Sequence, residues 1–109
     1  MIKVEIIKEV DNIKQVTVDG HADFAEHGSD IVCAGVSAVV FGLINSVDVL
    51  DDDVQFDISA NEDETGHLTY RSLKSTEKEQ LLLNAMLIAL KTIEENYLEY
   101  ITIETREVN

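Results

Sequence analysis

The sequence predicts an α+β fold in two layers, a mostly antiparallel five-stranded sheet covered by two helices in the order ββαββαβ. Three observations lead to this prediction. Five short segments alternate apolar and polar residues, which is the period of a strand with one buried face. Two longer segments carry apolar residues at helical spacing. The 109 residues have the size of one domain, which we expect to span residues 1–109.

The first two alternating segments predict an N-terminal hairpin, formed by residues 2–10 and 13–19. Their apolar members share one face and are Ile2, Val4, Ile6, Val16 and Val18. Asp11 and Asn12 are expected to form the two-residue turn between the strands, because both residue types tolerate positive φ. Gly20 ends the second strand.

Residues 30 to about 47 predict the first helix, with Ser29 or Asp30 as its N-cap. Apolar residues occupy nearly every position, a pattern that indicates a helix buried all round. Several of these residues are β-branched, which would favour a strand. The segment is too long for an ordinary strand, however, so we expect a helix.

Two further alternating segments, residues 54–59 and 65–72, predict the third and fourth strands. Phe56 and Ile58 alternate in the first of them, and Leu68 and Tyr70 share a face in the second. An acidic turn over residues 61–64 joins the two strands.

The second helix is expected to begin at Thr76 and Glu79, which have the spacing of a capping box, and to run to about Asn96. Its apolar stripe consists of Leu82, Met86, Ala89, Leu90 and Ile93. Residues 98–105 alternate again and predict the fifth strand.

Charge and cysteine content limit the partners and the compartment. Eight basic and 22 acidic residues give a formal net charge of −14, which disfavours direct binding to nucleic acid. The same charge would favour a basic partner, although it can also serve solubility alone. No run of about 18 apolar residues is apparent, so we expect no membrane span. The single cysteine, Cys33, suits a reducing compartment, and we expect a cytoplasmic protein.

The residues that could take part in catalysis lie between positions 20 and 33. Cys33 is expected in the first turn or so of the first helix, where exposed N–H groups stabilise a thiolate. His21 lies at the mouth of the same segment, and its imidazole could take the thiol proton if the segment folds back. The alternative is structural: Cys33 as a small buried apolar residue and His21 as a surface residue.

The run Gly20-His21-Ala22, followed by the run from Gly28-Ser29-Asp30-Ile31-Val32-Cys33 to Ala34-Gly35-Val36-Ser37-Ala38, resembles the signature of the Prp family of ribosomal-processing cysteine proteases. The resemblance implies that Cys33 is the nucleophile and His21 the catalytic histidine. It implies a bacterial enzyme, as in the Firmicutes, that removes an N-terminal extension from the precursor of large-subunit ribosomal protein twenty-seven. It also implies a homodimer and an aromatic residue before the scissile bond.

Other residues of the motif are candidates for supporting roles. Asp30 could orient His21, as could Asp23 or Glu26, but Asp30 could equally be a helix cap. Ser37 lies one turn beyond Cys33 and could hydrogen-bond near the site or merely let helix and sheet approach closely.

Three features of the same region have structural alternatives or remain open. Gly20 and Gly28 bracket the segment as possible hinges, with simple turns as the alternative. Phe24 could pack on substrate or anchor the segment in the core. Backbone N–H groups near Cys33 are the expected oxyanion donors.

We expect no metal and no cofactor. His27 and His67 could join His21 in a metal site, but zinc ligands occur at tighter spacings than these. Without a second cysteine, thiol–disulfide exchange within the chain is excluded. The second functional hypothesis is a non-enzymatic acidic chaperone or assembly factor that binds a basic ribosomal protein.

Overall fold

The computed structural model describes residues 1–20, 27–61 and 66–108, and at 27–30 and 61 it describes the backbone alone. The elements follow in the predicted order ββαββαβ. They are β1 (Ile2–Glu9), β2 (Asn12–Asp19), α1 (His27–Leu50), β3 (Gln55–Asn61), β4 (His67–Lys74), α2 (Glu77–Asn96) and β5 (Ile101–Val108).

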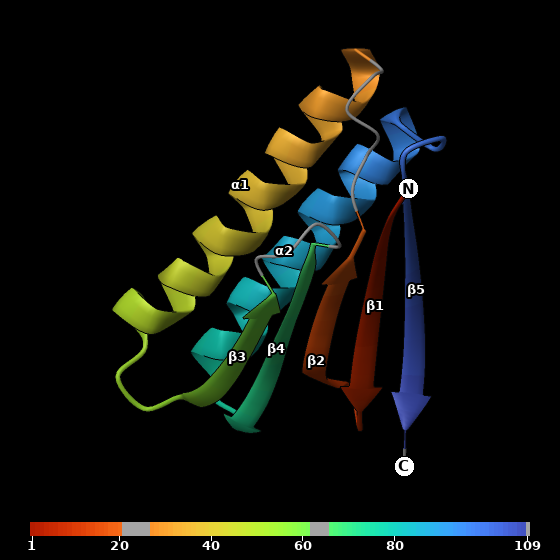
Figure 1. The fold of residues 1–109 in the computed structure, drawn as a ribbon. Coiled ribbons are helices and arrows are strands. Elements are labelled where there is room, and N and C mark those ends of the chain that lie inside the picture. The colour runs from red at the N-terminus through yellow and green to blue at the C-terminus, as the bar shows by residue number, and fades with distance from the viewer. Residues whose placement is uncertain (21–26, 62–65, 109) are drawn as a thin grey trace.

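The five strands form one sheet in the order β3-β4-β2-β1-β5. Three of the four neighbouring pairs are antiparallel, and β1 pairs with β5 in parallel. Both helices lie on the same side of the sheet (Figure 1). The α+β two-layer fold is therefore confirmed.

The core lies between the sheet and the helices. Alternate residues of the three central strands point into it, as their sequence period requires. Its fully buried members include Val4, Ile6, Ile13, Val16, Tyr70, Val32, Val47, Leu83, Met86 and Leu90. The opposite side chains of the strands, such as Thr17, Thr69 and Arg71, occupy the face of the sheet away from the helices.

The first hairpin turns one residue earlier than predicted. Val10 and Asp11 have positive φ angles of 47° and 66°, whereas Asn12 already belongs to β2. The reason is the register, which pairs Glu9 with Asn12 and leaves two residues between them. Positive φ at both central positions is the geometry of a type I′ turn, although valine seldom adopts it.

Helix α1 differs from its prediction in extent and in burial. It begins at His27, so neither Ser29 nor Asp30 is its N-cap, and it continues to Leu50. One face is buried and consists of Val32, Val36, Val40, Ile44 and Val47. The opposite face is exposed, with Ile31 at 53% and Val49 at 73%. The prediction of a helix buried all round was wrong, because α2 and the sheet contact only one side of it (Figure 1).

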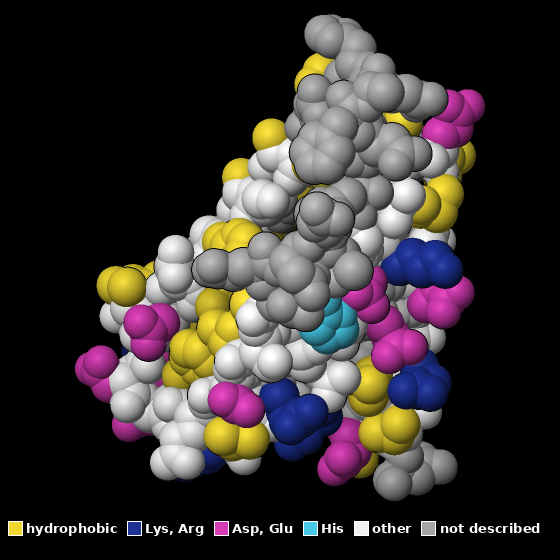
Figure 2. Space-filling model, in the orientation of Figure 1, with side chains coloured by type: hydrophobic (Ala, Val, Ile, Leu, Met, Phe, Trp, Pro, Cys, Tyr) yellow, Lys and Arg dark blue, Asp and Glu magenta, His cyan; other side chains and the backbone are white. Residues whose placement is uncertain are grey.

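By length and composition alone, residues 31–50 of α1 would be able to cross a membrane. The core helix of a soluble protein passes the same test, and the buried face of α1 contributes to the core of this fold. Figure 2 shows hydrophobic side chains along the outer side of α1.

The N-terminus of α2 satisfies half of the predicted capping box. Thr76 is the N-cap, and its hydroxyl accepts a hydrogen bond from the backbone N–H of Glu79. The Glu79 carboxylate is instead buried and accepts hydrogen bonds from Tyr70 and Ser72. The buried apolar residues of α2 are Leu83, Met86, Leu87 and Leu90. Of the predicted stripe, Met86 and Leu90 are buried, whereas Leu82 is only partly buried.

The last three strands begin later than predicted. Strand β3 starts at residue 55 and β4 at residue 67, each one or two residues beyond its predicted start. Strand β5 starts at Ile101, because the chain first turns at 97–100, where the Tyr100 N–H bonds the Tyr97 carbonyl. Leu98 consequently lies outside the sheet and is 70% exposed.

Candidate functional site

Cys33 lies in the second turn of α1 and is half-buried at the rim of the core. It lines a cavity of about 330 Å³ that lies between α1, the end of β2 and the start of β4. The other lining residues are mostly apolar and are Ile2, Val18, Gly20, Val36, Ser37, Phe41, Ala60, Gly66, His67 and Leu68. The cavity therefore presents a thiol to a space that suits an apolar side chain.

The position of Cys33 within the helix changes the expected electrostatics. The N–H groups at the start of a helix lack partners in it, and in α1 they include those of residues 27–29. Cys33 follows them, so its own N–H lies within the regular hydrogen-bonding pattern of the helix. Cys33 was expected in the first turn or so of the helix and lies in its second turn. The role of backbone N–H groups near Cys33 as oxyanion donors stays a prediction.

Gly20, which directly precedes the predicted catalytic segment, also lines this cavity. It follows the last residue of β2, and its N–H donates to the Gly66 carbonyl at 2.9 Å. Its φ is +94°, and a Cβ built on it would lie 2.5 Å from the Met1 carbonyl oxygen. Only glycine fits this position without displacing β1. Gly20 and Cys33 thus line one cavity, and His21 follows Gly20 directly in the sequence.

His21 itself lies outside the described residues, as do Asp23, Phe24 and Glu26. The Asp30 side chain is also outside the description, although its backbone lies in the first turn of α1. The roles assigned to these residues, including the choice of a third residue to orient His21, stay predictions.

The remaining predicted residues are in place on α1. Ser37 lines the same cavity as Cys33, one turn further along the helix, as its spacing indicates. Gly28 is the second residue of α1, so it is part of the helix rather than of the connection before it.

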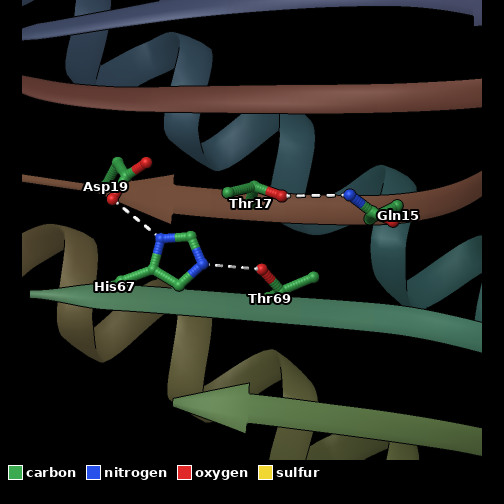
Figure 3. Close-up of polar contacts among 5 residues, drawn as sticks. All are labelled: Gln15, Thr17, Asp19, His67 and Thr69. Carbon is green, nitrogen blue, oxygen red and sulfur yellow. Dashed lines mark hydrogen bonds and ion pairs between the residues drawn. The ribbon is translucent and has the colours of Figure 1, made fainter. Parts of the chain in front are cut away.

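His67 makes contacts that the sequence did not reveal. Its Nδ1 lies 2.8 Å from Asp19 Oδ1, and its Nε2 lies 3.1 Å from Thr69 Oγ1. Figure 3 shows the ring between these two partners, in front of the sheet, with the helices behind it. The ring therefore lies on the side of the sheet away from the helices, and its hydrogen-bond partners there are Asp19 and Thr69. The alternation of β4 places His67 and Thr69 on one face, but only the pairing with β2 brings Asp19 to them.

Known proteins are similar to this chain in both sequence and fold. Residues 1–102 match the family described as cysteine protease Prp. The ribosomal processing cysteine protease Prp of Staphylococcus aureus is 43% identical over 106 residues, which cover 93% of this chain and 95% of that protein.

Two solved structures of the S. aureus protease superpose closely on this fold. The complex with a substrate peptide has a TM-score of 0.87 and 41% identity, and the complex with a covalently linked product peptide has a TM-score of 0.86 and 40% identity. Each match covers 97% of this chain and 100% of that one. A half-buried thiol in an apolar cavity suits an enzyme of this class. This chain belongs to the Prp family of cysteine proteases.

Proposed function

We propose that this protease removes the N-terminal extension from the precursor of large-subunit ribosomal protein twenty-seven, with Cys33 as nucleophile and His21 as general base and acid. The observation that carries the proposal is the shared cavity of Cys33 and Gly20, because His21 is bonded directly to Gly20. The name and the peptide complexes of the S. aureus relative support a peptide substrate from a ribosomal protein.

The chemistry follows from these two groups. The imidazole of His21 takes the proton of the Cys33 thiol, and the thiolate attacks the scissile carbonyl to form a tetrahedral intermediate. The C–N bond then breaks as His21 returns the proton to the leaving amine, which leaves a thioester on Cys33. Water, deprotonated by the same imidazole, hydrolyses the thioester and restores the thiol.

The cavity also supports a preference at the cleavage site. Phe41 and Leu68 contribute apolar surface to it beside Cys33, together with Val36. A substrate side chain that enters this space would be selected for apolar character, and an aromatic ring before the scissile bond fits that requirement.

A cleavage assay read by intact mass tests the proposal. The protein is mixed with the precursor, and Cys33→Ala and His21→Ala variants are measured beside it, with His27→Ala as the neighbouring-histidine control. We expect one N-terminal fragment from wild type and from the control, and at least a thousandfold less from the other two variants. Cleavage that persists in Cys33→Ala would assign the activity to another nucleophile.

The alternative, an acidic chaperone or assembly factor for a basic ribosomal protein, predicts a different outcome of that experiment. The precursor would bind tightly but keep its mass. Because the relatives are proteases and the cavity holds a thiol, we favour proteolysis. The rate of Cys33 alkylation by iodoacetamide below pH 7 separates the two hypotheses, since only an activated thiol reacts quickly there.

We further propose a homodimer formed through the exposed face of α1. Residues 31–47 contain no charged side chain, although the whole protein has a net charge of −14. Two copies repel each other elsewhere, and at this face Ala34 and Ala38 allow close approach of two helices. Ala38→Glu is expected to give a monomer in analytical ultracentrifugation, whereas Leu81→Glu on the exposed side of α2 should not.

A cytoplasmic location is part of the proposal. The thiol of Cys33 must stay reduced to act as a nucleophile, and a reducing compartment keeps it so. Cell fractionation with an antibody to the protein would test it, with recovery in the membrane or culture fluid as the contrary result.

A further inference from the structure

A polar contact joins the end of β2 to the start of β4. Asp19 is the last residue of β2, His67 is the first of β4, and the two are opposite in the antiparallel register. An ionised carboxylate only accepts hydrogen bonds, so Nδ1 of His67 carries the proton shared with Asp19. Nε2 then accepts from the Thr69 hydroxyl in neutral His67 and donates to it in the imidazolium. The ring is held in both protonation states (Figure 3).

A second hydrogen bond lies immediately beside the first. The Gly20 N–H donates to the Gly66 carbonyl at 2.9 Å, so successive residues on each strand end are joined. We call the four residues Asp19, Gly20, Gly66 and His67 the β2–β4 clamp. On its other side, Gly20 is in close contact with the Met1 carbonyl, which leaves no room for a Cβ. Gly20 is thus fixed between the starts of β1 and β4.

The clamp lies at the cavity of the nucleophile. The backbone members Gly20 and Gly66 line it together with Cys33, and so does His67. From Gly20 the chain continues directly to residue 21. A shift of Gly20 would therefore displace the point at which His21 is attached, and a misplacement of a catalytic group by about 1 Å can cost on the order of 100-fold in rate.

From this arrangement we infer that Asp19 and His67 are positioning residues for His21: their side-chain contact fixes the strand ends and hence the point at which the catalytic segment leaves the sheet. The inference rests on the proposed role of His21. It assigns a function to two residues that do not touch the reacting atoms.

Direct catalysis by this group is a weaker interpretation. The order Asp19, His67 and Thr69 is that of a carboxylate, an imidazole and a hydroxyl in a catalytic triad. However, the Asp19 and His67 side chains are 53% and 38% exposed and lie on the open face of the sheet. A triad carboxylate is buried, and water screens an exposed one.

Four variants test the positioning role. His67→Ala and Asp19→Ala remove the side-chain contact, and the double variant removes both partners. His67→Asn retains an N–H near the position of Nδ1 and should restore the contact. Arg71→Ala is the matched control, because Arg71 bonds Gln15 across the same two strands and on the same face, but further from Gly20.

The first readout is steady-state cleavage of a precursor-derived peptide. We expect kcat to fall about tenfold in both single variants with KM within about twofold, because His21 acts in the chemical step. The double variant should lose no more than either single one, since both remove the same contact. His67→Asn should recover most of the loss, and Arg71→Ala should match wild type. An unchanged kcat in His67→Ala, or an equal loss in Arg71→Ala, would overturn the inference.

The second readout does not depend on the substrate. The rate of Cys33 alkylation by iodoacetamide is followed against pH, with His21→Ala as the reference for a thiol without its partner. If His67→Ala shifts the profile toward this reference while Arg71→Ala does not, the positioning role holds even if wild type fails to cleave the precursor. If His21→Ala itself alkylates like wild type, the Cys33–His21 pair and the positioning role fail together. If the alkylation profile is shifted in His21→Ala but is that of wild type in His67→Ala, the positioning role is overturned while the Cys33–His21 pair stands.

Discussion

Glu79 is a buried acid of α2 that is hydrogen-bonded to two residues of one strand, β4. It is completely buried and accepts a hydrogen bond from the Tyr70 hydroxyl at 2.5 Å and one from Ser72 Oγ at 2.8 Å. Burial, and then the bond to Glu79, raise the pKa of Tyr70 far above its ordinary value, so its hydroxyl remains a donor. The carboxylate thus ties β4 to the first turn of α2.

We expect Glu79→Ala to lower the free energy of unfolding by about 3 kcal/mol, because two buried hydroxyls lose their acceptor. Glu77→Ala, in the same turn but exposed, should change it by less than about 0.5 kcal/mol. Urea unfolding followed by circular dichroism measures both. Equal effects in the two variants would show that the buried contacts add nothing to stability.

Gly20 and Gly42 form a matched pair for backbone conformation. Gly20 has a φ of +94° and its Cβ would meet the Met1 carbonyl, whereas nothing lies within 4 Å of a Cβ at Gly42. Gly20→Ala should therefore destabilise the protein by about 2 kcal/mol or more. Gly42→Ala, in the middle of α1, should stabilise it by about 0.5 to 1 kcal/mol. Thermal unfolding would show opposite shifts in Tm, and a tolerated Gly20→Ala would contradict the strain.

At the scale of the elements, Asp51 joins the two helices. It directly follows α1, and its carboxylate accepts from the hydroxyl of Thr76, the N-cap of α2. A second carboxylate oxygen accepts from the Asp53 N–H at 3.0 Å. The Thr76 hydroxyl, as the largest cause, holds the pKa of Asp51 below its ordinary value.

A carboxyl group whose pKa is lower in the folded than in the unfolded protein stabilises the fold when it is ionised. This stabilisation is fully present above the pKa of the unfolded state, about 3.9 for aspartate, and is lost as the pH falls through the pKa of the folded state. The difference in unfolding free energy between wild type and Asp51→Asn should accordingly be present at pH 6 and close below about pH 4. Asp52→Asn, on the exposed neighbour, is the control and should show no such closure. If the difference in unfolding free energy between wild type and Asp51→Asn does not change with pH, the ionised Asp51 carboxylate does not stabilise the fold in this way.

The elements also show what the sequence could predict. Strict alternation at Ile2, Val4 and Ile6 identified both the strand and its buried face, since one strand face has one environment. In α1 the apolar residues surround the helix, so the pattern could not say which side meets the sheet. The parallel pairing of β5 with β1 depends on a crossover through α2, which is a property of the whole chain.

In the candidate site, too, some features follow from local spacing and others depend on how distant strands pair. Cys33 and Ser37 lie one turn apart on α1, so local spacing alone puts them on one side of the helix, and both line one cavity. The pairing of Asp19 with His67 joins residues 48 positions apart and depends on strand register, which no local pattern encodes.

At the scale of the whole molecule, the net charge of −14 is the dominant property. Acidic side chains are spread over the visible face rather than gathered at one place (Figure 2). Such a distribution creates a long-range field that attracts a basic protein from many directions. The charge should therefore act on encounter with the substrate rather than on the chemical step.

Salt separates these two effects. Raising the ionic strength from about 0.05 to 0.5 M shortens the screening length to a few ångströms and should lower kcat/KM for the basic precursor about tenfold. The value of kcat at saturating precursor should stay within about twofold, because the bound substrate no longer depends on long-range encounter. A short precursor-derived peptide with its basic residues replaced by glutamine is the matched control, and its kcat/KM should hardly change. If the precursor and the neutral peptide lose kcat/KM equally, salt acts on the enzyme itself and the field of the acidic surface has no part in capture.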